Sequence, residues 1–590
     1  MSPVVASRRL TPARVLSFLF ANLVWLAPLF LAPATNASAA TDTYTVGSTA
    51  DDSGVVLATA QTNCPVSTAG TNTTGDGSCT LRDAIMAANA DTTATALVVD
   101  MTTIGGTITV GSNLPQMSVA TGTTFEGPGA GALTVSGANL YQLFVFLSGS
   151  GGGTFQYFTI ANGFVSATGG CTCDPGYGAG VYGYTGVPLI LTDMVFSGNS
   201  AANGGGAVVA IGVLTVTGTT FSNNTSPAAG GGIAGALYVI GSPATIYQST
   251  FSGNTAWIGS AVYTYTPVTL TISDSTFANN SNGTEGVVGG SGAVFNDNLS
   301  TLTIHDSTFW NNVGAAGVGG ALNNAGTMTV TDSIVGSPGD SGNADECYSN
   351  NTVNGPGCPA NGDANGNITA PATFNLAPLG FYGGANETLL PMSGSAAICG
   401  GKTGAGLDAD ATGAALTVDE RGFPLDPSCG AGTTDAGAVQ LNPLVVNSAT
   451  DDGPGAGAST CTTDCTLRDA INVANNAGNG DITFDSSLNG STITLGDSTA
   501  TPGTALTITG GVNIAGPGAT LLTLSGQNKY EPFYVAAGSL SVSGLTITNG
   551  SATTGTNAGF GGAILNGGSL SVSNVTFTNN TCLLYTSRCV

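Results

Sequence analysis

The sequence predicts an all-β fold: a right-handed parallel β-helix in two tandem copies, each with a short capping helix at its N-terminal end. Three observations support this prediction. A strand-like unit recurs every 25 to 32 residues, glycine clusters recur between the units, and the heptapeptide CTLRDAI occurs twice, at Cys79 and at Cys465. The composition agrees, because 90 glycines and only 7% charged residues favour tight turns and buried strands over solvated helices.

The repeated unit is clearest as LTVTGTTFSNN at Leu214 and LTISDSTFANN at Leu270. Apolar and polar residues alternate with a period of two in its first half, which is typical of a β-strand. The unit length matches one coil of a parallel β-helix, whereas a propeller blade needs about 40 residues and a sandwich does not repeat its sequence. Other copies of the unit begin at Leu189, Ala244, Leu302, Met328, Leu540 and Leu570.

Alignment of the units places like residues in columns, which we expect to stack inside the solenoid. An internal asparagine column can satisfy its amide groups by hydrogen bonding from coil to coil. The phenylalanine column contains Phe196, Phe221, Phe251, Phe277 and Phe309. The asparagine column, three residues later, contains Asn199, Asn224, Asn254, Asn280 and Asn312.

The motif CTLRDAI is predicted to begin a helix. Thr80 with Asp83, and Thr466 with Asp469, fit the capping pattern in which Ser or Thr is followed three residues later by an acid. The first coil of a β-helix exposes unpaired backbone groups and apolar rows, so a short amphipathic helix laid over it would act as a lid. Two copies of the motif therefore predict two solenoids, each with its own lid.

The arginine inside each motif is predicted to hold the lid through a partly buried ion pair. Arg82 follows the acidic pair at 51–52, and Arg468 follows the acidic pair at 451–452. A catalytic role for Arg82 is the alternative, and it would require a carboxylate-rich groove beside the guanidinium group.

These segments also resemble a known family. YTVGSTADD followed by CTLRDAIMAANA resembles the N-terminal module of CSLREA-domain proteins, with Thr80 and Asp83 standing where the family name has Ser and Glu. Between the two motifs, NLAPLGFYGGANETLLPMSGSAAICGG, VDERGFPLDPSCG and TDAGAVQ resemble the closing segment of such proteins. The resemblance implies an exported bacterial protein with a right-handed parallel β-helix, at the surface or secreted, and often without an assigned activity.

The N-terminus has the pattern of an export signal. Three arginines within the first 14 residues precede an apolar run from Val15 to Ala32, and the tripeptide ASA at 37–39 offers a cleavage site. We therefore predict an extracellular or cell-surface protein with no membrane span after signal cleavage. An uncleaved membrane anchor is the alternative for this segment.

Export makes the 12 cysteines candidates for disulfides. Zinc binding is disfavoured, because His305 is the single histidine and no paired CxxC motifs occur. Proximity in sequence does not determine connectivity, and Cys171 with Cys173 would close a very tight ring. The candidate disulfide cysteines are Cys64 and Cys79, Cys347 and Cys358, Cys399 and Cys429, and Cys461 and Cys465.

Together these features predict the organisation of the chain. The last nine residues, CLLYTSRCV, break the compositional pattern and look like translated adaptor DNA, so the natural chain is expected to continue past Thr581. The predicted parts are a signal peptide (1–39), a cap module (40–96), a β-helix (97–340), a loop-rich closing segment with disulfides (341–440), a second cap module (441–481), a second, truncated β-helix (482–581) and a sequencing artefact (582–590).

Charge restricts the possible functions. A net charge of −25 with only nine Lys and Arg disfavours binding to nucleic acid. Between Arg82 and Lys402 there is no Lys or Arg, so the main coils lack the basic side chain on which a polysaccharide lyase depends. His305 falls in the outward threonine row and is predicted to be a solvated surface residue.

One acidic position recurs in consecutive units. Asp274, Asp306 and Asp332 are expected to stack about 5 Å apart, and such a ladder could bind Ca²⁺ through carboxylate oxygens. The alternative is that aspartate occupies this position because it favours a turn. No other cofactor is indicated.

The predicted function is a secreted or cell-surface β-helix with an adhesive, carbohydrate-contacting or scaffolding role and no evident catalytic site. Its partners would be extracellular glycans or surface proteins, and Tyr247, Tyr263 and Tyr265 are expected to be exposed and able to stack on sugars. The alternative is an enzyme similar to polysaccharide lyases or hydrolases that uses the aspartate ladder. The sequence does not determine the oligomeric state.

Overall fold

The structure is a computed structural model. It describes residues 41–68, 78–169, 175–227, 231–282, 292–314, 319–338, 346–349, 352–353, 357–370, 372–381, 385–392, 395–402, 416–422, 429, 432–440, 444–451, 465–477, 479–496, 505–552 and 561–582. The predicted signal peptide, Cys171, Cys173, Cys461 and all but the first residue of 582–590 lie outside the described residues. Within the described residues, no helix is long and apolar enough to cross a membrane.

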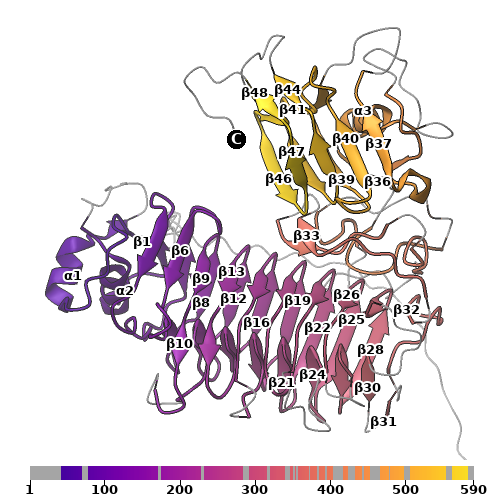
Figure 1. The fold of residues 1–590 in the computed structure, drawn as a ribbon. Coiled ribbons are helices and arrows are strands. Elements are labelled where there is room, and N and C mark those ends of the chain that lie inside the picture. The colour runs from indigo at the N-terminus through magenta and orange to yellow at the C-terminus, as the bar shows by residue number, and fades with distance from the viewer. Residues whose placement is uncertain are drawn as a thin grey trace, which may run out of the picture. The chain divides into compact units, whose positions relative to one another are not determined.

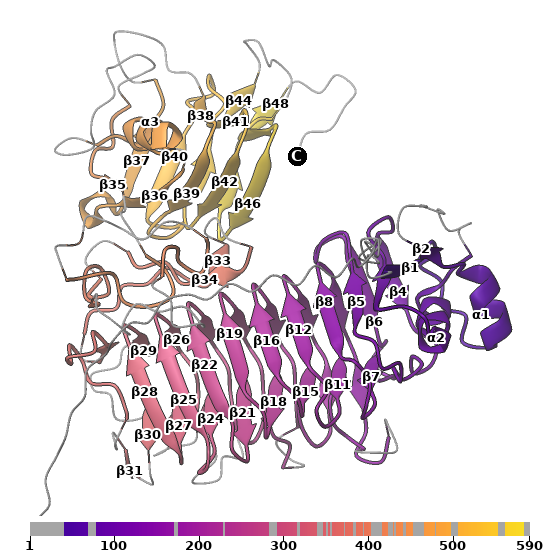
Figure 2. The same cartoon turned by 180° about the vertical axis from the view of Figure 1, so that it is seen from behind.

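The predicted right-handed parallel β-helix is confirmed (Figures 1 and 2). The first solenoid has three sheets in which each coil adds one strand beside the corresponding strand of the previous coil. Among the described strands, pairing is antiparallel only for β1 with β2, β30 with β31 and β33 with β34.

Sheet 1 runs in the order β2 (Ser67–Thr68), β1 (Thr41–Thr45), β3 (Ala96–Asp100), β5 (Thr123–Glu126), β8 (Gly153–Gln156), β12 (Leu189–Thr192), β16 (Leu214–Thr217), β19 (Ala244–Tyr247), β22 (Thr269–Ser273), β25 (Thr301–His305) and β28 (Thr327–Thr331). Sheet 2 contains β4 (Gly106–Thr109), β6 (Leu133–Ser136), β9 (Thr159–Ala161), β13 (Val195–Ser197), β17 (Thr220–Ser222), β20 (Thr250–Ser252), β23 (Thr276–Ala278), β26 (Thr308–Trp310), β29 (Ile334–Gly336) and β32 (Ile368–Thr369). Sheet 3 contains β7 (Phe144–Phe146), β11 (Val181–Gly183), β15 (Val208–Ala210), β18 (Leu237–Ile240), β21 (Val262–Tyr265), β24 (Val294–Asn296), β27 (Leu322–Asn324), β30 (Cys347–Ser349) and β31 (Thr352–Val353). Because β1 and β32 pair with these sheets, the solenoid extends beyond 97–340 at both ends.

The second solenoid repeats the plan with fewer coils. Its three main sheets are β35 (Leu444–Val446), β36 (Asn479–Phe484), β39 (Gly511–Ala515), β42 (Ser539–Ser543) and β46 (Ser569–Ser573); β37 (Ser491–Thr494), β40 (Leu522–Ser525), β43 (Thr546–Thr548) and β47 (Thr576–Thr578); and β38 (Leu506–Ile508), β41 (Phe533–Val535) and β45 (Ile564–Asn566). Small two-stranded pairs are β10 (Phe164–Val165) with β14 (Ser200–Ala201), β33 (Gly380–Phe381) with β34 (Glu387–Thr388), and β44 (Ser551–Ala552) with β48 (Thr581–Cys582).

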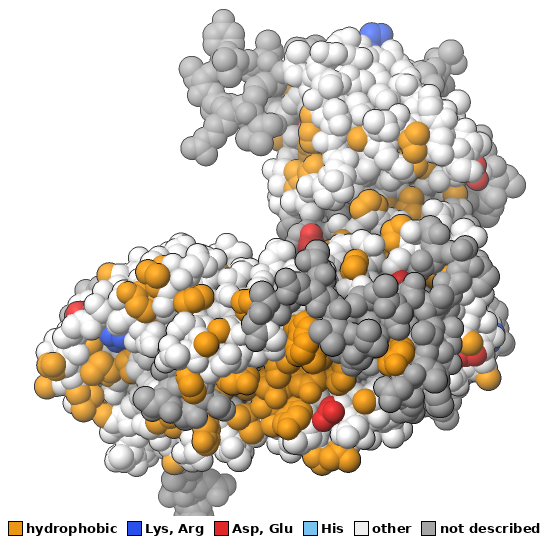
Figure 3. Space-filling model, turned by 60° about the horizontal axis from the view of Figure 1, so that its bottom comes forward, with side chains coloured by type: hydrophobic (Ala, Val, Ile, Leu, Met, Phe, Trp, Pro, Cys, Tyr) orange, Lys and Arg blue, Asp and Glu red, His pale blue; other side chains and the backbone are white. Residues whose placement is uncertain are grey.

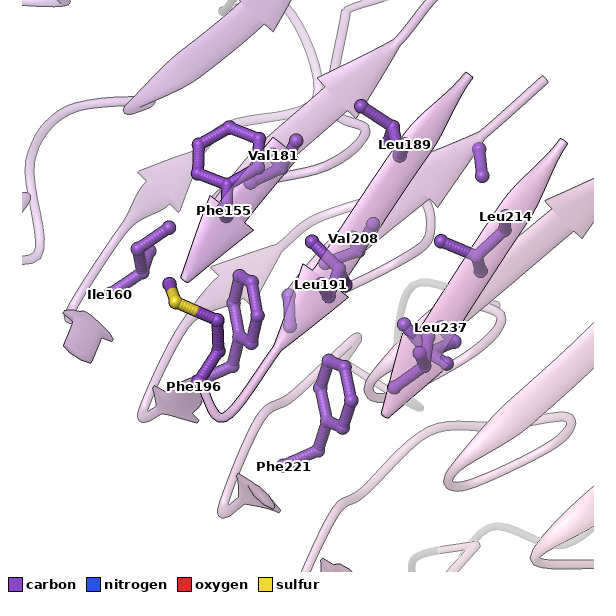
Figure 4. Close-up of a cluster of buried hydrophobic side chains, with 14 of the residues drawn as sticks. Phe155, Ile160, Val181, Leu189, Leu191, Phe196, Val208, Leu214, Phe221 and Leu237 are labelled. Carbon is purple, nitrogen blue, oxygen red and sulfur yellow. The ribbon is translucent and has the colours of Figure 1, made fainter. Parts of the chain in front are cut away.

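The phenylalanine column stacks in register inside the first solenoid. Phe221 pairs with Phe251, which pairs with Phe277, and the ring centroids are 4.7 and 4.6 Å apart. All five phenylalanines of the column are fully buried. Figure 4 shows Phe196 and Phe221 pointing into the interior with leucines and valines from the other two sheets, including Leu191 and Val208. The core is therefore a continuous apolar column enclosed by three sheets.

The asparagine column lies beside it and is hydrogen-bonded along its length. Each side-chain amide donates to the side-chain oxygen of the next coil at 2.9–3.0 Å, from Asn199 through to Asn312. Each amide also donates to a backbone carbonyl, as Asn254 does to Phe221 at 2.9 Å. The buried amides are thus satisfied where the chain turns after sheet 2.

A helix lies at the start of each solenoid (Figures 1 and 2). In α2 (Leu81–Ala90), Thr80 and Asp83 form a reciprocal capping box, and Leu81 and Ile85 are buried. In α3 (Leu467–Ala477), Thr466 accepts from the backbone N–H of Asp469 in the same way. The first cap module also contains α1 (Leu57–Asn63), and a short 3₁₀ helix covers Ser486–Leu488.

Disulfides join three of the candidate pairs. They link Cys64 with Cys79, Cys347 with Cys358, and Cys399 with Cys429. Cys465 is also disulfide-bonded.

Described residues in the later part of the predicted closing segment (341–440), among them Asn386, Glu420 and Ala438, lie over the outer side of sheet 2. Glu420 accepts hydrogen bonds from the hydroxyls of Thr250 at 2.9 Å and Thr276 at 2.5 Å. Thr308 accepts from the backbone N–H of Ala438 at 3.0 Å. The side chains of these three threonines point away from the core, yet they are buried because the closing segment covers them.

Replacing Glu420 with glutamine is expected to stabilise the protein at neutral and alkaline pH. Burial raises the pKa of the Glu420 carboxyl well above its usual value of 4.5, although the threonine hydroxyls oppose the shift. A carboxyl whose pKa is raised in the folded state contributes fully to stability below about pH 4.5, and this contribution is lost as the pH rises through the folded-state pKa. The stability of E420Q relative to the parent protein should therefore increase with pH, measured by urea unfolding at a series of pH values.

The partly exposed Glu126 on β5 provides a matched control, because Glu126→Gln removes a carboxylate without touching the closing segment. A variant E420Q that is no more stable than the parent protein at pH 8 would contradict this account of the buried carboxyl.

Candidate carbohydrate-contacting face

Sheet 3 carries an aromatic column on its outer side. Its strands alternate, so that in β18 Leu237 and Val239 join the interior core while Tyr238 and Ile240 face outward. Strand pairing aligns Tyr238 with Tyr263. The aligned outward residues are Val145, Tyr182, Val209, Tyr238, Tyr263 and Phe295.

The rings of this column contact one another from coil to coil. Ring centroids are 5.4 Å apart for Tyr238 and Tyr263, and 5.2 Å apart for Tyr263 and Phe295. Tyr265 lies beside both tyrosines, at 6.4 and 6.3 Å, and its side chain is 45% exposed. We call this cluster the tyrosine face, and it comprises Tyr177, Tyr182, Tyr184, Tyr238, Tyr263, Tyr265 and Phe295.

Figure 3 shows hydrophobic side chains gathered in a broad area over the underside of the first solenoid. Isoleucines from the turns that precede sheet 3, Ile233 and Ile258, pack against the aromatic column and bury most of its rings. Burial, with a further contribution from the charge of Asp297, raises the pKa of Tyr263 to about 12. The phenol of Tyr263 therefore keeps its proton at neutral pH and remains a hydrogen-bond donor.

The structure brings together two of the three tyrosines expected to be exposed. Tyr265 is exposed, but the expectation was wrong for Tyr263, which is 9% exposed because its neighbours pack over it. Tyr247 is partly exposed and lies on β19 of sheet 1, away from the cluster. The aromatic column itself could have been found from the sequence. The segments GAGVY, AGALY, GSAVY and SGAVF each contain glycine and end in an aromatic residue of the column.

The aspartate ladder is buried. Asp274, Asp306 and Asp332 have no exposed side-chain surface, and their φ angles are 43°, 43° and 45°. This is the left-handed turn conformation that Asn and Asp tolerate, which the alternative interpretation expected. The closing segment covers the last of them, because the backbone N–H of Lys402 donates to the Asp332 carboxylate and that of Gly437 donates to its carbonyl at 2.7 Å.

The prediction that His305 is solvated is wrong. The side chain is 9% exposed, and its Nδ1 lies 2.7 Å from the hydroxyl of Thr331 in the next coil. Strand pairing does align His305 with Ser273 and Thr331, so the row was identified correctly. All three residues are buried, whereas Thr217 and Tyr247, which belong to earlier coils of the same row, are partly exposed.

The two motif arginines form ion pairs with the aspartates that precede them. Arg82 donates to both carboxylate oxygens of Asp51, at 2.7 and 2.9 Å, and to the carbonyls of Ser112 and Asn113. Arg468 pairs with Asp451 in the same way, at 2.5 and 2.8 Å. Four of the five N–H groups of the Arg82 guanidinium are thereby engaged, and the side chain is buried, so this arginine holds the lid rather than facing a groove.

Among the described residues, one group places three potential metal-ligating side chains together: Cys399, Cys429 and Asp435. The two cysteines form a disulfide, so their sulfur atoms are not thiolate ligands. The three aspartates of the ladder do not converge to form such a group.

No curated protein matches the chain. A search of solved structures found similarity to an arginine-to-alanine mutant of a PL6-family alginate lyase, with 10% sequence identity and a TM-score of 0.20. The alignment covers 82% of this chain and 75% of the lyase. At this TM-score the similarity carries no argument about activity. Residues 143–335, which contain most coils of the first solenoid, match the family model described as the right-handed β-helix region.

Proposed function

We propose that this protein is a secreted or cell-surface β-helix whose tyrosine face contacts carbohydrate. The observation that carries the proposal is the ring of Tyr265, exposed at the edge of a packed aromatic cluster that continues through Tyr238, Tyr263 and Phe295. Rings held rigidly by their neighbours offer apolar surfaces for sugar rings at little entropic cost. The partly exposed carboxylate of Asp297, whose charge contributes to the raised pKa of Tyr263, adds a polar group of the kind that recognises hydroxyls.

The solenoid geometry suits an extended polymer. Successive strands of sheet 3 are about 4.8 Å apart, which is comparable to the length of one sugar unit, so a polymer lying along the solenoid axis could follow the coils past Tyr177, Tyr184 and Tyr265, the rings of the tyrosine face that reach solvent. The net charge of −25 disfavours anionic polysaccharides, and we therefore propose neutral glycans as ligands. Disulfides within the described residues are compatible with the oxidising environment of a secreted protein.

The burial of the aspartate ladder weighs against the alternative, a lyase or hydrolase that uses it. Asp274, Asp306 and Asp332 have no exposed surface on which a substrate could lie. General acid–base catalysis requires the catalytic group within hydrogen-bonding distance of the reacting atoms. A role in glycan recognition does not depend on access of the ligand to these three aspartates.

Replacing Tyr265 with alanine is expected to weaken glycan binding about 2- to 13-fold, because one aromatic contact is worth about 0.5–1.5 kcal/mol. Neutral ligands would first be identified on a glycan array and their affinities then measured by calorimetry with the purified protein. Tyr157→Ala is the control, because Tyr157 is 39% exposed but lies between β8 and β9, outside the tyrosine face.

Equal losses in both variants, or no binding to any neutral glycan, would refute the proposal. Release of reducing ends or unsaturated uronates from a polysaccharide panel would instead favour the enzymatic alternative.

A further inference from the structure

A pocket in the first cap module brings two carboxylates together. It has a volume of about 300 Å³ and lies between β1 and the C-terminal end of α2. We call it the cap pocket; its lining includes Asp42, Tyr44, Cys64, Val66, Ala87 and Asp91. It lies apart from the tyrosine face, on a different sheet.

Asp91 is well supplied with hydrogen bonds. One carboxylate oxygen accepts from the hydroxyl of Tyr44 at 2.9 Å. The other accepts from the backbone N–H groups of Thr93 at 2.8 Å and Ala94 at 3.1 Å. These bonds outweigh the effect of burial and lower the pKa of Asp91 to about 2, so this carboxylate is ionised at neutral pH.

Asp42, in contrast to Asp91, has a carboxylate oxygen that accepts no hydrogen bond. Its side chain is 5% exposed, and its buried Oδ1 has no hydrogen-bond partner. A buried polar oxygen without a partner is costly and rare in native proteins. Burial, with further contributions from a hydrogen bond to Asp91 and from its charge, raises the pKa of Asp42.

Among the described residues, no Lys or Arg lines the cap pocket. Between Arg14 and Lys402 the single Lys or Arg is Arg82, and its guanidinium is paired with Asp51 and donates to two carbonyls. A cation from solvent could therefore supply the positive charge that the lining of the pocket lacks.

The second cap module shows that the acid pair is not needed to build a cap. Both modules have the arginine–aspartate ion pair. In the sequence alignment of the two modules, however, Asn442, Leu444 and Ala477 stand where the first module has Asp42, Tyr44 and Asp91. The carboxylates of the first cap are thus an addition to the shared lid architecture.

We propose that the cap pocket binds Ca²⁺ through the carboxylates of Asp42 and Asp91, with water molecules completing the coordination. Ca²⁺ accepts six to eight oxygen ligands in irregular geometry, and an open pocket of this volume accommodates the waters. The ion supplies the partner that Asp42 Oδ1 lacks and joins β1 to the end of α2. With only two carboxylates, the affinity expected is that of extracellular calcium modules, a Kd of about 0.1–1 mM.

The proposal is tested by calorimetric titration of the chelator-treated protein with CaCl₂. The parent protein should bind Ca²⁺ in this range with an increase in Tm, and Asp42→Asn should weaken binding at least tenfold. Asp100→Asn is the matched control, because Asp100 accepts from the backbone N–H and hydroxyl of Thr102 as Asp91 does from Thr93, but lies outside the pocket. It should leave binding unchanged.

A second measurement does not depend on the folding of D42N. Tb³⁺ bound at Asp91 should emit when tyrosine is excited, and Tyr44→Phe should reduce this emission while calcium binding persists. The proposal is overturned by an absence of saturable binding up to about 10 mM Ca²⁺, ten times the weakest expected Kd. It is also overturned if D42N and D100N bind equally, or if Y44F leaves the terbium emission unchanged. A tighter response to Mg²⁺ than to Ca²⁺ would likewise contradict the assignment.

Discussion

Replacing Arg421 with methionine is expected to lower the free energy of unfolding by about 3–5 kcal/mol, because it leaves two buried carboxylates without their counter-charge. Arg421, in the closing segment, donates to Asp419 at 2.6 and 2.9 Å and to Asp481 on β36 at 2.7 Å. It also donates to the carbonyl of Gln440, and the side chains of Arg421 and Asp419 have no exposed surface. Burial opposes the positive charge, but the two carboxylates outweigh it and raise the pKa of Arg421 above its usual value.

Urea unfolding followed by tryptophan fluorescence would measure the loss. The double variant Arg421→Met with Asp481→Asn should be less destabilised than the sum of the two single variants, because one substitution removes the partner that the other leaves unpaired. Strict additivity, or a loss below about 1 kcal/mol for R421M, would show that the cluster contributes less than a buried ion pair normally does.

Replacing Phe251 with alanine is expected to cost about 3–5 kcal/mol. Phe251 lies in the middle of the stacked column, fully buried between Phe221 and Phe277 with ring planes nearly parallel. Removing the ring leaves a cavity that neighbouring coils cannot fill without breaking the register of three sheets. Calorimetry and urea unfolding would measure the loss, and hydrogen exchange would show whether it spreads to adjacent coils.

Phe577 provides the matched control, because it occupies the equivalent position on β47 of the second solenoid but is 46% exposed in this structure. Phe577→Ala should cost less than about 1 kcal/mol, since little buried area is lost. Similar losses in the two variants would mean that the stacked column is not the main source of core stability.

Interior features were predictable because they repeat. The columns at Phe251 and Asn254 recur at each coil, and a side chain that meets a copy of itself above and below can be placed by alignment alone. The lid was predictable for a related reason: the contacts of Thr80 and Asp83 are local, and a capping box depends on residues three positions apart.

The exposure of outward rows was not predictable in this way. Thr276 faces away from the core by its period of two, yet it is buried by Glu420, which lies 144 residues further along the chain. His305 is also buried, against the prediction that it is solvated, and the side chains of the aspartate ladder have no exposed surface. The tyrosine face was missed in part because Tyr238 gains its partners from neighbouring coils and from the turns that pack over sheet 3.

The sequence by itself therefore determined the coil, the register and the direction in which each strand residue points, since these follow from periodicity and from short-range backbone chemistry. Only the tertiary structure decided which outward side chains meet solvent, which lie beneath the closing segment, and which distant carboxylates, such as Asp42 and Asp91, line the same pocket. The physical reason is that these contacts join segments that share no repeat. Contacts of this kind cannot be predicted from a local sequence pattern.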